Sequence, residues 1–178
     1  IPWHRVVRAD GSDCEPGEPG EIIVSGPSVT PGYWRDRAAT EAALIDGWFH
    51  TGDVGVFDED GFLRIVDRIK DLIISGGYNI APSEIEDVIN EMPGVREVAV
   101  ISVPDTKFGE TPGAIVVPGG LAPAEVVAHC AARLADFKVP RYVVPRDEPL
   151  PRMASGKIDK RALAEEYSDL STTATKVR

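Results

Sequence analysis

A polar loop near the C-terminus contains a lysine whose positive charge could act on phosphoryl groups. Lys157 follows Ser155 and Gly156 in this loop. An ammonium group placed there can orient two anionic reactants and stabilise the charge that develops on phosphoryl oxygens. It is not the lysine of a P-loop, because Ile158 stands where Ser or Thr would bind Mg²⁺. The alternative interpretation is a plain solvated lysine.

The segment around Lys157 is basic, although the chain as a whole is acidic. The 178 residues carry 19 Lys and Arg against 29 Asp and Glu, a net charge of −10, which argues against nonspecific nucleic-acid binding. Between 138 and 161 the balance is reversed, with Lys138, Arg141, Arg146, Arg152, Lys157, Lys160 and Arg161 against Asp147, Glu148 and Asp159. Such a patch suits a small polyanion such as a nucleotide or coenzyme A, and a solvated charged face is the alternative.

An acidic residue in the first half of the chain has the chemistry of a ribose site. Asp53 follows Thr51 and Gly52 in a predicted turn, and a carboxylate can accept two hydrogen bonds from a 2′,3′-diol. The alternative for Asp53 is an Asx turn that binds its own backbone. Arg68 by itself is typical of a salt-bridge partner at the end of a strand.

Composition excludes several other classes of site. Cys14, Cys130 and the three histidines show no metal-ligand spacing, so we expect no metal site in this chain. Two scattered cysteines are typical of reduced thiols in a cytoplasmic protein. No segment approaches the roughly 18 apolar residues of a membrane span, and no signal peptide is visible. We expect a cytoplasmic protein without a membrane span.

The elements that must position these residues change in type along the chain. The first third is predicted to be β-rich, with strands over 21–24, 54–58 and 62–66 and one short helix from Thr40 to Leu44. The later part alternates strands with helices, which indicates an α+β or α/β body of roughly 100 residues. Its predicted elements are a strand over 95–103, a loop over 104–113, a strand over 114–117, a helix beginning at Pro123, a strand over 142–144 and a helix from the Asp159 cap to Tyr167.

Between these bodies lies a segment with strong local signals. Leu72–Ile74 predicts a short buried strand, and Gly76 and Gly77 allow a turn with positive φ. Ser83 and Glu86 have the spacing of a capping box at the start of a helix. Residues 168–178 contain few apolar side chains, and we expect a disordered tail.

Four motifs in this order resemble those of the adenylate-forming enzymes. They are residues 20–26 with 32–34, residues 48–53, residues 67–86 and residues 151–157. This superfamily includes acyl-CoA and aryl-CoA synthetases, peptide-synthetase adenylation domains and firefly luciferase. The resemblance covers most of the chain.

The resemblance implies an α+β fold with two bodies. Residues 1–69 would be the C-terminal part of a large N-terminal domain, the end of a distorted β-barrel. Lys70 would be the hinge, which by itself reads as a plain exposed lysine. Residues 71–167 would be a small mobile α/β lid domain, followed by the tail. The phosphate loop, the adenine-contacting segment and the acyl pocket of the family precede the first motif, so the resemblance implies a C-terminal fragment.

The resemblance also assigns roles to the candidate residues. Lys157 matches the catalytic lysine and contacts the nucleotide, while Asp53 and Arg68 match the residues that bind its ribose. Gly76 and Gly77 would let a pantetheine arm pass close to the backbone. Phe108 resembles the aromatic residue that flanks this tunnel, and covering the core is its equally weighted alternative.

The implied function is that of an acyl-CoA synthetase, as in fatty acid metabolism. A carboxylic acid, ATP and CoA would give acyl-CoA, AMP and pyrophosphate through an acyl-adenylate, with Mg²⁺ and most ATP contacts supplied by the missing N-terminal part. The apolar Leu72–Ser75 favours acyl-CoA ligases over peptide-synthetase domains, and Ile74 stands where luciferase has a lysine. The alternatives are an acyl-AMP ligase or an adenylation domain that loads a carrier protein, and, in another class, a non-catalytic lid or docking module.

Overall fold

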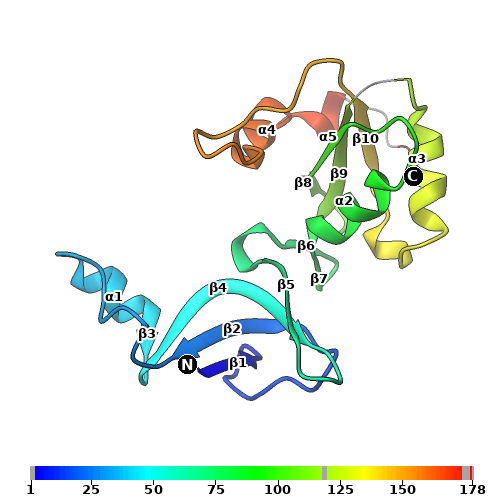
Figure 1. Ribbon diagram of the computed structural model, residues 1–178. Helices are drawn as coiled ribbons and strands as arrows, with labels where there is room; N and C mark the ends of the chain where they lie inside the picture. Colours follow the sequence, from blue (N-terminus) through cyan, green and yellow to red (C-terminus); the bar gives the residue numbers. More distant parts are fainter. Residues whose placement is uncertain (1–2, 118–119, 174–176, 178) are drawn as a thin grey trace. The chain divides into compact units, whose positions relative to one another are not determined.

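The protein has two compact units, each with a sheet of its own. The computed structural model describes residues 3–117, 120–173 and 177. The units are Ile1–Asp71 and Leu72–Arg178. The chain contains helices and strands of the mixed α+β class, and the sheet of the first unit is curled like half a barrel (Figure 1). The predicted fold class is therefore confirmed. None of the described helices is long and apolar enough to cross a bilayer.

The first unit is built on five antiparallel strands. Their order is β1 (Trp3–Val7), β2 (Gly20–Ser25), β4 (Trp48–Phe57) and β3 (Leu44–Ile45), with β5 (Leu63–Arg68) also pairing with β4. The long strand β4 curves along its length (Figure 1). The core of the sheet consists of buried β-branched residues, which favour strands: Val6, Val7, Ile22, Ile23, Val54 and Val56.

The turn predicted before Asp53 is wrong, because β4 begins at Trp48 and includes Asp53. Gly52 has a φ of 72°, and the β4–β5 register shifts between Val54 and Gly55. These two features let the strand bend without ending. The residues Thr51 and Gly52, which suggested a turn, instead mark a bend within one strand.

The short helix of this unit also starts earlier than predicted. Helix α1 spans Arg37–Ala43, and the Asp36 carboxylate caps it by accepting a hydrogen bond from the Ala39 amide at 2.9 Å. Thr40 lies inside the helix, where its hydroxyl donates to the Asp36 carbonyl at 2.7 Å. Aspartate is at least as good a cap as threonine, and its position one turn earlier decides the start of the helix.

The second unit is a five-stranded sheet with helices on both faces. The strand order is β10 (Tyr142–Pro145), β9 (Gly109–Val117), β6 (Ile73–Ser75) and β7 (Tyr78–Ile80), and β8 (Glu97–Asp105) pairs with β9. The pairing of β10 with β9 is parallel, and the other pairings are antiparallel. The chain also contains two short 3₁₀ turns. One is Ile69–Asp71 at the end of the first unit, and the other is Asp136–Lys138 in the second unit.

Buried side chains alternate between the two faces of the central strands and so form two hydrophobic cores. Val98 and Val100 of β8 belong to one cluster, which α2 (Pro82–Asn90) and α3 (Pro123–Ala131) cover. Ala99 and Ile101 belong to the opposite cluster, which also contains Leu163 and Leu170 from α4 (Lys160–Glu166) and α5 (Leu170–Thr173). Because side chains alternate between the faces of a strand, a run with apolar residues at consecutive positions needs cover on both sides.

The loop predicted over 104–113 is wrong, because β8 and β9 continue into it. Only residues 106–108 connect the two strands, and Asp105 pairs with Gly109. The Asp105 carboxylate accepts hydrogen bonds from the amides of Lys107 at 2.8 Å and Phe108 at 3.1 Å. This Asx-type turn closes a tight hairpin. Pro104 is tolerated because β8 pairs on one side only.

The predicted capping box at the start of α2 is also wrong. Pro82 occupies the first turn, Ala81 is the N-cap and no side chain caps the helix. Glu86 instead accepts a hydrogen bond from the amide of Val100 in β8 at 2.7 Å. The Glu86 carboxylate thus forms a tertiary hydrogen bond to β8 and not the local bond that a capping box requires.

Part of the predicted disordered tail is helical, while its residues 174–176 and 178 lie outside the described residues. The predicted Asp159 cap is confirmed, because its carboxylate accepts a hydrogen bond from the Ala162 amide at 3.0 Å. Within 168–178, however, the structure describes α5, and Leu170 is only 4% exposed. Burial of this side chain against the second core holds the helical turn in place.

Candidate functional site

In the first unit, Asp53 and Arg68 lie opposite each other on neighbouring strands. They are cross-strand partners of β4 and β5, and Arg68 Nε donates to Asp53 Oδ1 at 2.9 Å. The Asp53 side chain is 32% exposed and that of Arg68 is 53% exposed. Asp53 Oδ2 has no hydrogen bond among the described residues. The carboxylate is therefore held by the arginine at one oxygen and keeps the other available to a ligand hydroxyl.

A network of hydrogen bonds holds the strand that precedes Asp53. Glu21 of β2 uses one carboxylate oxygen to accept from the Gly52 amide at 3.1 Å, and its other oxygen lies 2.8 Å from His50 Nδ1. The Thr51 hydroxyl donates to the Ile22 carbonyl at 2.7 Å and accepts from the Asp53 amide at 3.1 Å. The position of Asp53 is thus fixed by the Glu21 side chain and the Ile22 carbonyl of β2 as well as by its own strand.

A cavity of ≈ 360 Å³ lies beside this pair, lined by Gly52, Arg68, Ile69 and Lys70. Lys70 is exposed in the 3₁₀ turn Ile69–Asp71, next to the division of the units after Asp71. A Cβ atom added at Gly52 would meet no atom within 4 Å, which indicates open space beside the backbone there. The structure therefore brings three predicted residues, Asp53, Arg68 and Lys70, to one region of the first unit.

In the second unit, the glycine turn packs against the turn that contains Phe108. Gly76 and Gly77 have φ values of 57° and 88° and connect β6 to β7, which confirms the predicted turn. The Gly76 amide donates to the Phe108 carbonyl at 2.9 Å. A Cβ atom at Gly76 would lie 3.2 Å from the Phe108 ring. A glycine is thus required here both for its backbone conformation and for the close approach of the ring.

Two cations near Phe108 were not predicted as site residues. The Arg141 guanidinium lies 4.3 Å from the centre of the Phe108 ring, and the Lys107 ammonium lies 4.9 Å from it. Both distances suit a cation–π interaction. Arg141 belongs to the basic segment noted in the sequence, but only the fold shows that it shares a surface with Gly76.

Lys157 lies in a hydrogen-bonded hairpin and not in a loose loop. Arg152 and Ile158 form a β-bridge, and the Met153 amide donates to the Lys157 carbonyl at 2.9 Å. The Gly156 amide donates to the Met153 carbonyl, also at 2.9 Å. The lysine is exposed and has no ion-pair partner in the part of the chain that the structure describes. Its ammonium is presented outward from a defined backbone.

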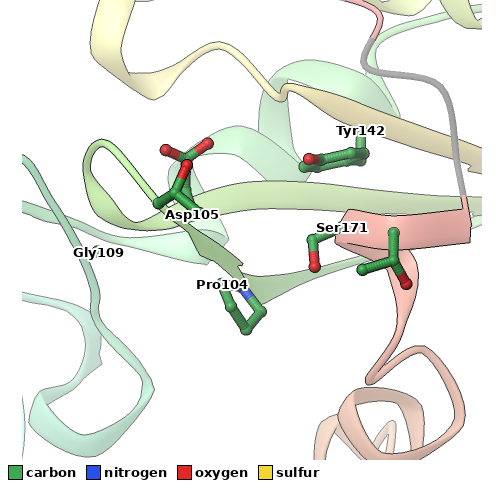
Figure 2. A pocket seen from close by; sticks show the side chains of 7 residues that line it. Pro104, Asp105, Gly109, Tyr142 and Ser171 are labelled. Atoms are coloured by element: carbon green, nitrogen blue, oxygen red, sulfur yellow. The ribbon is translucent and has the colours of Figure 1, made fainter.

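The second unit also has a cavity of ≈ 470 Å³ that contains none of the predicted residues (Figure 2). Its lining includes Asp105, Tyr142 and Ser171, whose side chains surround the hollow in Figure 2. Asp105 connects this cavity to the candidate site, because its carboxylate fixes the Phe108 turn.

The remaining titratable groups give no sign of a metal centre or a reactive thiol. No group of three or more His, Cys, Asp or Glu side chains with metal-binding geometry occurs among residues 3–117, 120–173 and 177. Burial raises the pKa of Cys130 to about 11, so this thiol is neutral and serves as a core residue of the second unit.

Comparison with known proteins gives a consistent group of relatives. Residues 84–157 match the family described as AMP-binding enzyme C-terminal domain. The chain is 51% identical over 150 residues to a 2-succinylbenzoate–CoA ligase of Listeria monocytogenes, covering 84% of this chain and 32% of that protein. It is 46% identical over 164 residues to a long-chain-fatty-acid–CoA ligase of Escherichia coli, covering 91% of this chain and 29% of that protein.

A solved structure agrees with these relatives. ATP-bound MatB from Rhodopseudomonas palustris superposes with a TM-score of 0.87 at 41% identity, over 95% of this chain and 34% of the other. The chain thus spans about a third of the length of the proteins it matches.

Proposed function

Because this chain belongs to the superfamily of adenylate-forming enzymes, within which it corresponds to the C-terminal region of acyl-CoA ligases, we propose that the full-length protein joins a carboxylic acid to coenzyme A. One observation carries the choice of acceptor. The Phe108 ring lies against Gly76 and beneath the Arg141 guanidinium. An apolar strip beside exposed glycines suits a pantetheine arm, and a nearby guanidinium suits a phosphate.

The nucleotide end of the reaction is proposed for the first unit. Asp53 Oδ2 would accept a hydrogen bond from a ribose hydroxyl, and Arg68, which fixes Oδ1 at 2.9 Å, would orient the carboxylate. The cavity beside Gly52 and Arg68 leaves room for a sugar. The described residues include no metal-binding cluster, so Mg²⁺ and most contacts to the ATP phosphates would come from other parts of the full-length protein.

Lys157 would act in the first half-reaction. An oxygen of the substrate carboxylate attacks the α-phosphorus of ATP, a new O–P bond forms, and the bond to pyrophosphate breaks. Two anions approach each other in this step, and an ammonium between them offsets their repulsion and the charge that builds on the phosphoryl oxygens. The absence of an ion-pair partner for Lys157 among the described residues supports this role.

The second half-reaction would use the surface around Gly76, Gly77 and Phe108. The CoA thiolate attacks the acyl carbon, a thioester bond forms, and AMP leaves with the electrons of the broken C–O bond. We propose that Lys70 is the pivot that exchanges Lys157 for this surface between the half-reactions. An exposed 3₁₀ turn next to the division of the units supports that assignment, since hinges are short segments that absorb φ/ψ changes.

A substrate panel tests the proposal. Pyrophosphate release by the full-length protein is measured with aromatic and long-chain carboxylic acids, with and without CoA. We expect release with one class of acid and formation of its acyl-CoA. Adenylation that never leads to an acyl-CoA would contradict CoA as the acceptor and favour a carrier protein, and no pyrophosphate release with any acid would contradict the ligase itself.

A further inference from the structure

The hairpin that presents Lys157 is anchored on both sides by ion pairs to distant glutamates. On the N-terminal side, Arg152 forms an ion pair with Glu97 through Nη2, and its Nη1 donates to the Gly156 carbonyl at 2.9 Å. On the C-terminal side, Lys160 Nζ lies 2.7 Å from Glu86 Oε1. The two cations flank the hairpin, and the two carboxylates belong to other elements.

Each of these glutamates also accepts a backbone hydrogen bond. Glu97 accepts from the Leu150 amide at 2.8 Å, and Glu86 accepts from the Val100 amide at 2.7 Å. Their side chains are only 22% and 17% exposed. The Leu150 bond and then Arg152 lower the pKa of Glu97, so this carboxylate stays ionised at neutral pH.

Both anchors lead to the same strand. Glu97 is the first residue of β8, and Glu86 is bonded to Val100 within it. Because β9 is the one strand that pairs with β8 among the described residues, the other edge of β8 has amides that need acceptors. The hairpin is therefore attached to β8 directly through Glu97, and through Glu86 to α2, which is itself bonded to β8.

The hydrogen bonds of Arg152 connect the sheet to the residue next to Lys157. A guanidinium is a planar fork that can donate to two acceptors at once. Here it joins the Glu97 carboxylate to the carbonyl of Gly156, the residue that precedes the lysine. Partly exposed ion pairs contribute little to stability, so the consequence of this arrangement is the orientation of the loop.

We propose that Arg152 with Glu97, and Lys160 with Glu86, are positioning residues that hold the Lys157 ammonium ready for adenylation. The inference rests on the proposed function and adds to it the residues that orient Lys157 for adenylation. Without the anchors the hairpin would still form through its backbone bonds, but its direction from the sheet would vary. Loss of orientation by about 1 Å is enough to lower a rate about 100-fold.

The test compares Arg152→Met, Arg152→Lys and Glu97→Gln in the full-length protein. Adenylation is followed by ATP–pyrophosphate exchange, and thioester formation is started separately from supplied acyl-adenylate. We expect Arg152→Met to lower kcat for adenylation about 10- to 100-fold, with KM for ATP and thioester formation near wild type. Arg152→Lys restores only part of the rate, because one ammonium does not reproduce the fork. Glu97→Gln keeps the size of the side chain and an acceptor for Leu150, so it should fold even if Arg152→Met does not.

Arg133→Met is the matched control. Arg133 also joins a glutamate to a backbone carbonyl, with Nε 3.2 Å from Glu91 and Nη1 3.2 Å from the His129 carbonyl, but it lies outside the hairpin. We expect this variant to keep both half-reactions.

A double-mutant cycle separates positioning from a general structural role. With Lys157→Ala present, Arg152→Met should cause no further loss of adenylation, because the group it positions is gone. A wild-type adenylation rate in both Arg152→Met and Glu97→Gln would overturn the inference. Equal losses in both half-reactions, or a further loss in the double variant, would show a structural role only. If Lys157→Ala alone adenylates normally, the proposed function fails, which is a distinct result.

Discussion

The Asp53–Arg68 pair and the Lys157 hairpin represent two ways of positioning a charged side chain. Asp53 and Arg68 lie on paired strands, and the register of β4 and β5 brings them together. Lys157 lies on a short hairpin whose own hydrogen bonds define its shape. Its direction depends on Glu97 and Glu86, which belong to elements far away in the sequence.

The two sites therefore respond differently to substitution. The strand pair is held by main-chain hydrogen bonds on both sides of β4, so a single side-chain change leaves its backbone in place. The hairpin is held to the sheet by side chains, so a single substitution can change its orientation. We therefore expect changes at Asp53 to affect nucleotide affinity, and changes around Lys157 to affect rate.

The largest effect is expected from Lys157→Ala. Removing the ammonium from the full-length protein should slow acyl-adenylate formation by about 1,000-fold, since it removes the charge that stabilises the transition state. Thioester formation from supplied acyl-adenylate should fall much less. Pyrophosphate release and acyl-CoA formation, measured separately, check this. Equal losses in both steps would show that Lys157 is structural, and the hairpin would then not serve to position a catalytic charge.

Lys70→Pro tests the segment that ends the first unit. Proline fixes φ near −65°, a value that a 3₁₀ turn such as Ile69–Asp71 allows at position 70. It also disfavours helical backbone angles at Ile69, so it restricts the conformations of the whole segment. We expect adenylation to persist while thioester formation falls about 100-fold, because bound acid and ATP select the adenylating state directly. An unchanged melting temperature with both half-reactions intact would refute the pivot, and a large loss of stability would show that Lys70 is a structural residue.

Asp53→Asn tests whether the Asp53–Arg68 pair binds the ribose. A hydrogen bond to a charged acceptor contributes about 1.5–3 kcal/mol, so KM for ATP should rise by roughly 10-fold or more, with a smaller change in kcat. Asp13→Asn provides a control, because Asp13 forms a similar pair with Arg5 at 2.7 Å in the same unit. A change in kcat alone at Asp53 would argue against ribose binding.

The smallest effect is the acid sensitivity of the Glu97 anchor. The Leu150 amide and then Arg152 lower the pKa of Glu97 below the usual glutamate value of 4.5. Its contribution to the free energy of unfolding is therefore complete above pH 4.5 and is lost as the pH falls through the folded-state pKa. Solvent screening limits it to about 1 kcal/mol or less. Melting temperatures of wild type and Glu97→Gln, measured from pH 7 to pH 3, should converge at the acid end, and a constant difference would contradict the anchor's charge.

The sequence by itself determined the features that depend on neighbouring residues. The glycine turn at Gly76 and Gly77 follows from their tolerance of positive φ, and the Asp159 cap follows from a carboxylate three residues before an amide that needs an acceptor. The resemblance of four motifs gave the superfamily, which the comparisons confirm. These signals are local, so they survive without knowledge of the fold.

Only the tertiary structure decided which distant groups share a partner. It placed Asp53 inside β4 and opposite Arg68, took Glu86 from the predicted capping box to an amide of β8, and buried Leu170 in an expected tail. It also placed Arg141 over Phe108 and joined Arg152 to Glu97. A carboxylate bonds to whichever donor the packed strands and helices bring within reach, and strand register and core packing, which fix that donor, involve residues that are far apart in the sequence.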